Sequence, residues 1–256
     1  MEGVGRRPFA FKETAISRLV LWNVDPTLVD AAQVTRSAYA EAFERATGTP
    51  LVYLAATAGR TDSEVFFEFF ARNDVDIEPG EEPLAEFVQA LADGFVRRRD
   101  QLPARARAAA GAAEALAAVA AMEDTVQTVV TGTIKPNAVA KLQAFGLDGY
   151  LDLSLGGFGS EGYPKASLIQ FTRMRAAEAR GAEFPERSTV YITDSVRDVE
   201  AAVIGRAAPI GVLSGSATES QLRAAGAEQV LEDLTDPRAV VGAVLKATDP
   251  PGTGIG

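Results

Sequence analysis

The sequence predicts an α/β fold in which a doubly wound parallel sheet carries helices on both faces. Three observations support this class. Apolar or β-branched runs alternate with helical stretches from residue 18 to residue 245, a pattern typical of parallel sheets. The first strand, expected at residues 19–24, begins with a continuous apolar run, as a strand buried on both faces should. The alternation is interrupted once, between about residues 30 and 103, by three helical stretches where one crossover helix would suffice.

The interruption is expected to be a helical insert. Its first helix is predicted at residues 29–47, where apolar residues recur every four positions, with Gly48 as the C-terminal cap. The segment from Thr61 to Glu64 is typical of an N-terminal cap and predicts a second helix. A third helix is expected at residues 83–99, with a proline at its start. An insert placed directly after the first strand would cover the strand ends as a lid.

The rest of the chain is expected to alternate strand and helix. The alanine-rich stretch at residues 104–122 has a high helix propensity. The other predicted helices are residues 137–145, 165–180, 196–205, 218–225 and 237–247. The predicted later strands are residues 125–130, 150–155, 189–192, 210–213 and 230–231. The expected division is a partly disordered leader at 1–17, an α/β core at 18–30 and 104–247, a helical cap at 31–103 and a flexible tail at 248–256.

Composition excludes several classes of function. The 256 residues carry a net charge of −10, which disfavours binding to nucleic acid or to anionic membranes. The chain has no cysteine and no histidine, so cysteine nucleophiles, zinc–thiolate sites and Ser-His-Asp triads are excluded. A metal site would be built from oxygen ligands, which suit Mg²⁺ or Ca²⁺. We find neither a secretory signal nor an apolar run of membrane-spanning length, and expect a cytoplasmic protein. The sequence indicates no oligomeric state.

Polar side chains follow the predicted strands where ligands bind in α/β sheets. Asn23 and Asp25 leave the first strand on the same side, because successive strand side chains point to opposite faces. Thr131 and Gly132 end a later strand, and a hydroxyl beside free backbone N–H groups can hold a phosphate oxygen. Considered alone, Thr131 is better explained as the cap of the next helix.

Lys165 begins a predicted helix, where a cation would neutralise a phosphoryl group, although most lysines are surface charges. Asp194 ends a buried strand, and Asp198 follows one helical turn later. Each of these two residues alone could be a helix cap or a dipole charge. Such explanations do not account for four polar signals at successive strand ends.

The order of an Asn-x-Asp loop, a threonine, a lysine and an aspartate pair resembles the four motifs of the haloacid dehalogenase-like (HAD) hydrolases, over roughly residues 18–245. The insert, with residues 59–62, resembles the α-helical cap of the phosphoglycolate phosphatase-like branch. The resemblance implies a Rossmann-like core with an inserted cap. It also implies Mg²⁺-dependent hydrolysis of a small phosphorylated metabolite.

The resemblance also implies roles for individual residues. Asn23 stands in the nucleophile's position, and Asp25 would be the acid/base residue. The implied phosphate-binding residues are Thr131, Gly132 and Lys165. The implied metal ligands are Asn23, the backbone carbonyl of Asp25, Asp194 and Asp198, with Asp198 alternatively supporting Lys165. Arg60, in the cap, would contact the substrate.

Asn23 is the main departure from the family pattern. A carboxamide is neutral and a poor nucleophile, so hydrolysis is expected to be impaired. Pro26, Thr133 and Thr193 also differ from the residues that the family usually has. Two explanations stay open: a phosphohydrolase whose nucleophile was replaced, by engineering or in nature, and a natural pseudophosphatase or enzyme of different chemistry that binds a phosphorylated ligand or a protein partner.

A remote alternative is dinucleotide binding through residues 157–162, which fit a Gly-x-Gly-x-x-Gly spacing. The helix should open within that motif, but Tyr163 and Pro164 intervene. Dehalogenase chemistry is less favoured than phosphatase chemistry because it would leave Asp194 and Asp198 without a purpose. Cap residues would select the substrate, and the sequence does not identify it.

Overall fold

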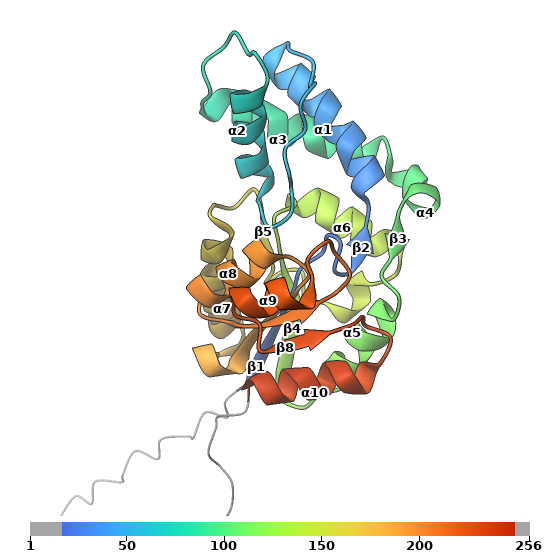
Figure 1. Ribbon diagram of the computed structural model, residues 1–256, viewed down its shortest axis with the longest axis vertical. Helices are drawn as coiled ribbons and strands as arrows, with labels where there is room; N and C mark the ends of the chain where they lie inside the picture. Colours follow the sequence, from blue (N-terminus) through green and yellow to red (C-terminus); the bar gives the residue numbers. More distant parts are fainter. Residues whose placement is uncertain (1–16, 249–256) are drawn as a thin grey trace, which may run out of the picture.

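The computed structural model describes residues 17–248, and a six-stranded sheet forms its core (Figure 1). All neighbouring strands pair in parallel, which confirms the predicted class. In spatial order the strands are β5 (Gly157–Phe158), β4 (Thr125–Thr131), β1 (Arg18–Trp22), β6 (Thr189–Thr193), β7 (Ala208–Val212) and β8 (Gln229–Leu231). The expected leader and tail fall almost entirely outside the described residues.

The register of the central strands aligns their carboxyl ends. Trp22, the last residue of β1, pairs with Val129 of β4 on one side and with Ile192 of β6 on the other. The next residue, Asn23, donates its backbone N–H to the Ile192 carbonyl at 2.9 Å. The polar residues that follow these strands therefore emerge at one edge of the sheet.

Both faces of the sheet are covered by helices. Along β1, Val20 and Trp22 belong to one hydrophobic cluster, whereas Leu19 and Leu21 belong to another, as the two-residue strand period requires. The first cluster includes residues of α5 (Ala112–Ala120), α6 (Lys135–Ala144) and α10 (Pro237–Thr248). The second includes residues of α7 (Lys165–Arg180) and α8 (Val196–Ile204). A third, smaller cluster joins α8 to α9 (Glu219–Ala225).

Three further helices stand at one end of the molecule, away from the sheet (Figure 1). They are α1 (Ala32–Thr47), α2 (Asp62–Arg72) and α3 (Glu81–Val96). Their shared core is aromatic, and Phe43, Phe66 and Phe69 are fully buried within it. Where the chain enters and leaves this region, β2 (Val29–Asp30) pairs antiparallel with β3 (Arg107–Ala108), a contact that helical periodicity did not predict.

The helix predicted at residues 104–122 is confirmed over Ala112–Ala120, but its predicted start at residue 104 was wrong. The structure has η1 (Arg99–Gln101), α4 (Leu102–Arg105) and β3 before α5 begins at Ala112. The helix propensity of alanine does not decide the structure here, because β3 pairs with β2 and because Gly111 has a left-handed backbone with φ of 77°. A Cβ at Gly111 would lie 2.2 Å from the Leu234 carbonyl oxygen, so this position has no room for a side chain.

The strand predicted at residues 150–155 was also wrong. The structure has η2 (Asp148–Tyr150) followed by turns. Two β4 side chains bind backbone carbonyls of this segment, because Gln127 Nε2 donates to Tyr150 at 2.8 Å and Thr128 Oγ1 donates to Asp152 at 2.7 Å. The strand that pairs with β4 begins only at Gly157.

Several predicted helix ends are confirmed. Gly48 is left-handed after α1, Gly181 is left-handed after α7, and Thr61 and Glu64 form a capping box at the start of α2. A further short helix, η3 (Glu186–Ser188), precedes β6. Within residues 17–248, no helix combines the length and the apolar character that crossing a membrane requires.

Candidate active site

A cavity of about 650 Å³ opens at the carboxyl ends of the central strands. Its walls come from the strand-end loops, from the start of α1 and from residues 54–60. Within the described residues, its lining includes all the predicted site residues except Asp198: Asn23, Asp25, Arg60, Thr131, Gly132, Lys165 and Asp194. The fold therefore brings together residues that lie up to 171 positions apart in the chain.

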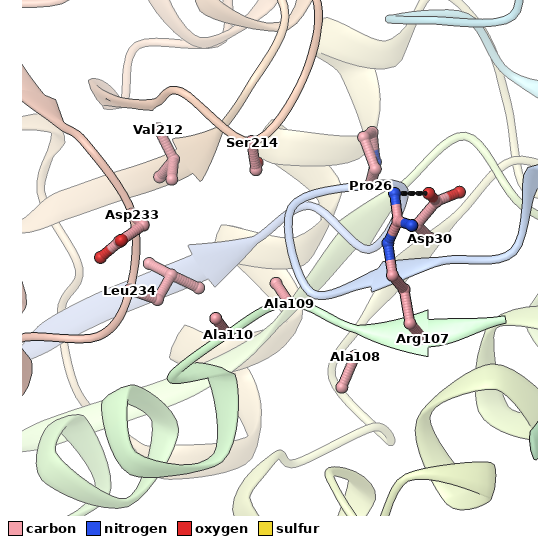
Figure 2. Close-up of a pocket in the computed structure, with 10 residues that line it drawn as sticks. All are labelled: Pro26, Asp30, Arg107, Ala108, Ala109, Ala110, Val212, Ser214, Asp233 and Leu234. Atoms are coloured by element: carbon pink, nitrogen blue, oxygen red, sulfur yellow. Dashed lines mark hydrogen bonds and ion pairs between the residues drawn. The ribbon is translucent and has the colours of Figure 1, made fainter.

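A smaller cavity of about 130 Å³ adjoins the chain that follows β1, at Pro26 and Asp30 (Figure 2). Pro26, Asp30 and Ser214 line both cavities. In the smaller one, Arg107 contacts Asp30 at 2.8 Å. Its only described charged residue besides this pair is Asp233, and the remaining lining is mainly alanine and aliphatic. Of these two cavities, the larger one therefore holds most of the polar side chains.

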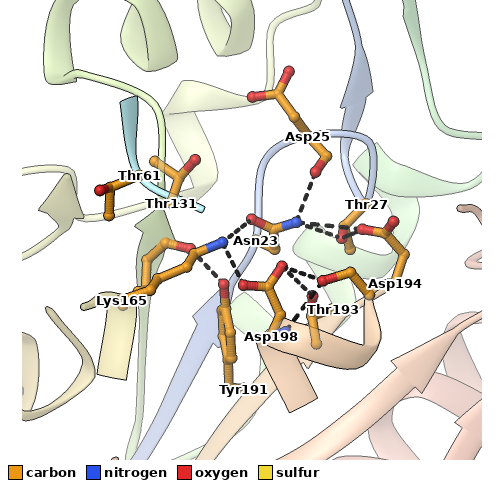
Figure 3. A network of polar contacts seen from close by, with 12 residues as sticks. Asn23, Asp25, Thr27, Thr61, Thr131, Lys165, Tyr191, Thr193, Asp194 and Asp198 are labelled. Carbon is orange, nitrogen blue, oxygen red and sulfur yellow. Dashed lines mark hydrogen bonds and ion pairs between the residues drawn. The ribbon is translucent and has the colours of Figure 1, made fainter. Parts of the chain in front are cut away.

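Asn23 lies at the centre of a polar network below the larger cavity and is 2% exposed (Figure 3). Lys165 Nζ donates to Asn23 Oδ1 at 3.1 Å. On the other side of the carboxamide, Nδ2 donates to the Asp25 carbonyl at 2.8 Å and to Asp194 Oδ1 at 3.3 Å. The orientation of the amide is assigned from these partners, because an ammonium group can only donate and a carbonyl can only accept.

Lys165 is held by a buried carboxylate. Asp198 Oδ1 lies 2.6 Å from Lys165 Nζ, and both side chains are almost fully buried. The hydroxyls of Thr193 and Ser195 donate to Asp198 Oδ2 at 3.1 and 2.8 Å. Of the two roles offered for Asp198, this geometry supports the one in which it positions Lys165.

Asp194 is buried beside the loop after β1. Thr27 Oγ1 donates to Asp194 Oδ1 at 2.6 Å. Burial raises the pKa of Asp194 to about 6, although the hydrogen bond from Thr27 opposes the rise. A Cβ at Gly215 would lie 2.2 Å from Asp194 Oδ2, so this loop approaches the carboxylate closely.

Sequence reasoning missed Lys141, which contacts the predicted acid/base residue. Its Nζ donates to both carboxylate oxygens of Asp25, at 2.7 and 2.8 Å, and its side chain is 1% exposed. Thr133 Oγ1 donates to Asp25 Oδ2 at 3.0 Å. One signal was available, because Lys141 falls on the apolar face of α6 with Ala138 and Leu142.

A second missed pair joins α1 and α2 to the site. Tyr39 OH donates to Asp62 Oδ1 at 2.5 Å, and the backbone N–H of Ile134 donates to Asp62 Oδ2 at 2.8 Å. Burial raises the pKa of Asp62 to about 6 and that of Tyr39 well above its usual value. Both side chains line the larger cavity. The sequence had indicated a helix-capping segment and a resemblance at residues 59–62, but no contact between Tyr39 and Asp62.

The glycines near the phosphate-binding candidates are required by close packing. A Cβ at Gly132 would lie 1.8 Å from the Arg60 carbonyl oxygen, and a Cβ at Gly159 would lie 1.7 Å from that of Gly132. Gly157 is already part of β5, and the next helix begins only at Lys165. Backbone packing therefore accounts for Gly157 and Gly159 of the Gly-x-Gly-x-x-Gly spacing without a dinucleotide.

Thr131 and Arg60 both line the cavity, and they differ in the contacts that hold their side chains. Thr131 is buried, and its hydroxyl oxygen accepts the Thr133 N–H at 3.2 Å. Arg60 lies 3.4 Å from Glu68 and donates to the Ala56 carbonyl at 3.3 Å. A substrate contact by Arg60 would compete with these bonds.

Oxygen atoms that would suit Mg²⁺ gather around Asn23, but the atom of Asn23 that faces them is a nitrogen. Mg²⁺ takes oxygen ligands in a near-octahedral arrangement, and an amide N–H group cannot serve as one. Within residues 17–248, no group of three or more aspartates or glutamates is placed to hold a metal ion. As arranged, Asn23, Asp25 and Asp194 do not fit Mg²⁺.

Comparisons with known structures agree with this fold. A hydrolase from Pseudomonas syringae is 22% identical, with a TM-score of 0.64, and the match covers 88% of this chain and 98% of that one. CbbY from Rhodobacter sphaeroides in complex with phosphate is 21% identical, with a TM-score of 0.66 and coverage of 86% and 96%. A mutant of the same CbbY in complex with xylulose-(1,5)bisphosphate is also 21% identical, with a TM-score of 0.65 and the same coverage. At these identities the likeness shows a shared fold.

Sequence comparison gives the family. No match is found among curated proteins. The family model described as haloacid dehalogenase-like hydrolase matches residues 20–202, which is more than half of the chain and includes Asn23, Thr131, Lys165 and Asp194. The chain belongs to the haloacid dehalogenase-like hydrolase family.

Proposed function

We propose that the chain binds a small phosphate monoester in the larger cavity and that Asn23 impairs its hydrolysis. One observation carries the proposal: the carboxamide of Asn23 lies at the end of β1 with the Lys165 ammonium on its oxygen. An amide oxygen so placed is a very poor nucleophile for phosphorus. By analogy with the loss of other catalytic nucleophiles, turnover is expected to fall about 10⁴-fold or more below that of an active relative.

The proposed phosphate ligands are Lys165, the Thr131 hydroxyl and the backbone N–H of Gly132. Asp198 orients Lys165, so its ammonium group is already positioned to meet phosphate oxygens. A cavity of about 650 Å³ is of the size that accepts a metabolite. The phosphate and bisphosphate complexes of CbbY support the same ligand class.

A second candidate is a natural pseudophosphatase or an enzyme of different chemistry. Lys141 favours it, because its ammonium group contacts both oxygens of Asp25. An acid/base residue must exchange a proton with the substrate through a carboxylate oxygen, and the Lys141 ammonium occupies both oxygens of Asp25. On this reading two steps of hydrolysis are disabled, and restoring the nucleophile alone would not restore activity.

Asn23→Asp separates the candidates. Phosphate release from a panel of monoesters would be measured with Mg²⁺ for the chain as written, for Asn23→Asp and for Asn23→Asp with Asp194→Asn. We expect Mg²⁺ to bind only in Asn23→Asp. The added carboxylate would there provide oxygen ligands together with Asp194 and the Asp25 carbonyl. Mg²⁺ would there neutralise charge on the phosphoryl group.

A gain of about 10³-fold or more in Asn23→Asp, lost again in the double variant, supports a phosphohydrolase disabled at Asn23. An inert Asn23→Asp that still binds phosphate favours the second candidate. Fast hydrolysis by the chain as written contradicts the assignment of impairment to Asn23.

A further inference from the structure

The amide nitrogen of Asn23 lies among oxygen acceptors that would otherwise face a cation. It donates to the Asp25 carbonyl at 2.8 Å, to Thr27 Oγ1 at 3.2 Å and to Asp194 Oδ1 at 3.3 Å (Figure 3). An amide nitrogen has two hydrogens, so these contacts use its donors fully.

Rotation of the Asn23 amide group by 180° would lose favourable hydrogen bonds. Rotation by 180° would place the NH₂ group against the Lys165 ammonium, where the two groups now lie 3.1 Å apart as acceptor and donor. It would also place the carbonyl oxygen against the Asp194 carboxylate. The contacts of Asn23 with Lys165, Asp194 and the Asp25 carbonyl would all change from favourable to repulsive, which is costly where little water is present.

The Oδ1 atom of Asp194 has little free capacity for a metal ion. It accepts from Thr27 at 2.6 Å and from Asn23 at 3.3 Å. A cation bound to Oδ1 would have to displace both donors.

The charges of the site are also nearly balanced. The Asn23 network and the Lys141–Asp25 pair hold three carboxylates and two ammonium groups, namely Asp25, Asp194, Asp198, Lys141 and Lys165. The other charged residues that line the cavity are two carboxylates and two guanidinium groups, namely Asp30, Asp62, Arg36 and Arg60. Each ammonium pairs with one carboxylate, at 2.7 Å for Asp25 and at 2.6 Å for Asp198. One negative charge is left, on Asp194, whereas an aspartate at position 23 would leave two. Carboxylate charge is what draws Mg²⁺ into such sites.

We infer that the chain binds its phosphorylated ligand without a divalent cation, and that the Asn23 amide and the Thr27 hydroxyl satisfy the oxygens that a cation would bridge. The ligand class rests on the proposed function. The cation independence rests on the hydrogen bonds of Asn23 and Thr27.

Mn²⁺ binding, followed by electron paramagnetic resonance without any phosphate ligand, tests the inference directly. Asn23→Asp is expected to bind Mn²⁺ about 100-fold tighter than the chain as written, because it gains both a ligand and a charge. Adding Asp194→Asn should remove that site. Glu123→Gln, which neutralises an exposed carboxylate, is the control for loose binding to an acidic surface. Tight Mn²⁺ binding by the chain as written, lost in Asp194→Asn, would overturn the inference.

Calorimetry with inorganic phosphate separates the inference from the proposed function. Equal affinity for phosphate in EDTA and in excess Mg²⁺ supports both the cation independence and the proposed ligand class. Binding that requires Mg²⁺ overturns the inference and leaves the proposed ligand class intact. No binding under either condition overturns the ligand class, while the Mn²⁺ measurement still decides whether a cation site exists.

Discussion

Lys141→Met tests the buried contact that restrains Asp25. Lys141 Nζ lies 2.7 and 2.8 Å from the two carboxylate oxygens, and 5.4 Å from the centre of the Phe95 ring. Methionine keeps most of the apolar volume of the lysine stem, so the substitution removes mainly the ammonium group. The Asp25 carboxylate would then be left without its cation.

The expected cost follows from the exposure of the two partners. Removing one member of a buried ion pair costs about 3–5 kcal/mol. The Asp25 side chain is 29% exposed, so water solvates part of the charge, and we expect a loss of about 2–3 kcal/mol in the free energy of unfolding. Adding Asp25→Asn should recover part of this loss, because no unpaired charge then remains.

Urea unfolding at pH 7 measures the four members of this double-mutant cycle. Lys135→Met is the matched control, because Lys135 is exposed on the same helix and lies 5.2 Å from the Phe158 ring. We expect it to cost about 1 kcal/mol or less. The reasoning is refuted if Lys141→Met costs no more than Lys135→Met, or if the cycle shows no coupling between Lys141 and Asp25.

Further predictions concern a buried acid and a close glycine. The pKa of Asp62 is raised from 3.8 to about 6, so the folded protein favours the protonated form of this side chain. The shift contributes about 3 kcal/mol to the free energy of unfolding. This contribution is present below pH 4 and is lost as the pH rises through 6. In urea unfolding from pH 4 to 7, Asp62→Asn should therefore gain stability relative to the unchanged chain as the pH rises, and a constant difference would contradict this. Gly159→Ala should cost about 1–3 kcal/mol, because its Cβ would lie 1.7 Å from the Gly132 carbonyl oxygen. Gly162→Ala, whose Cβ would meet only Phe171 at 3.8 Å, should change thermal stability little, and equal effects of the two substitutions would refute the packing argument.

The strand-end site was predictable because it depends on local signals repeated along the chain. Asn23 and Asp194 each follow a buried strand closely and Thr131 ends one, and parallel pairing with matched register brings such ends to one edge. The start of α7 at Lys165 was also predicted from the sequence, because the helical stretch at residues 165–180 begins there.

The contacts that modify the site were not predictable in the same way. Lys141 meets Asp25 across 116 residues, and Tyr39 meets Asp62 across 23, so neither pair has a fixed spacing. The orientation of the Asn23 amide depends on Lys165, 142 residues away. Such contacts follow from packing between elements, which propensity and periodicity do not describe.

The central claim is that the site binds a phosphate monoester and that the side chain at position 23 limits its hydrolysis. The most direct measurement is the ratio of kcat/KM for Asn23→Asp to that of the chain as written, with Mg²⁺ and the same phosphate monoesters. We predict a ratio of about 10³ or more for at least one ester. A ratio near 1, whether both proteins hydrolyse the esters fast or neither does, would contradict the claim.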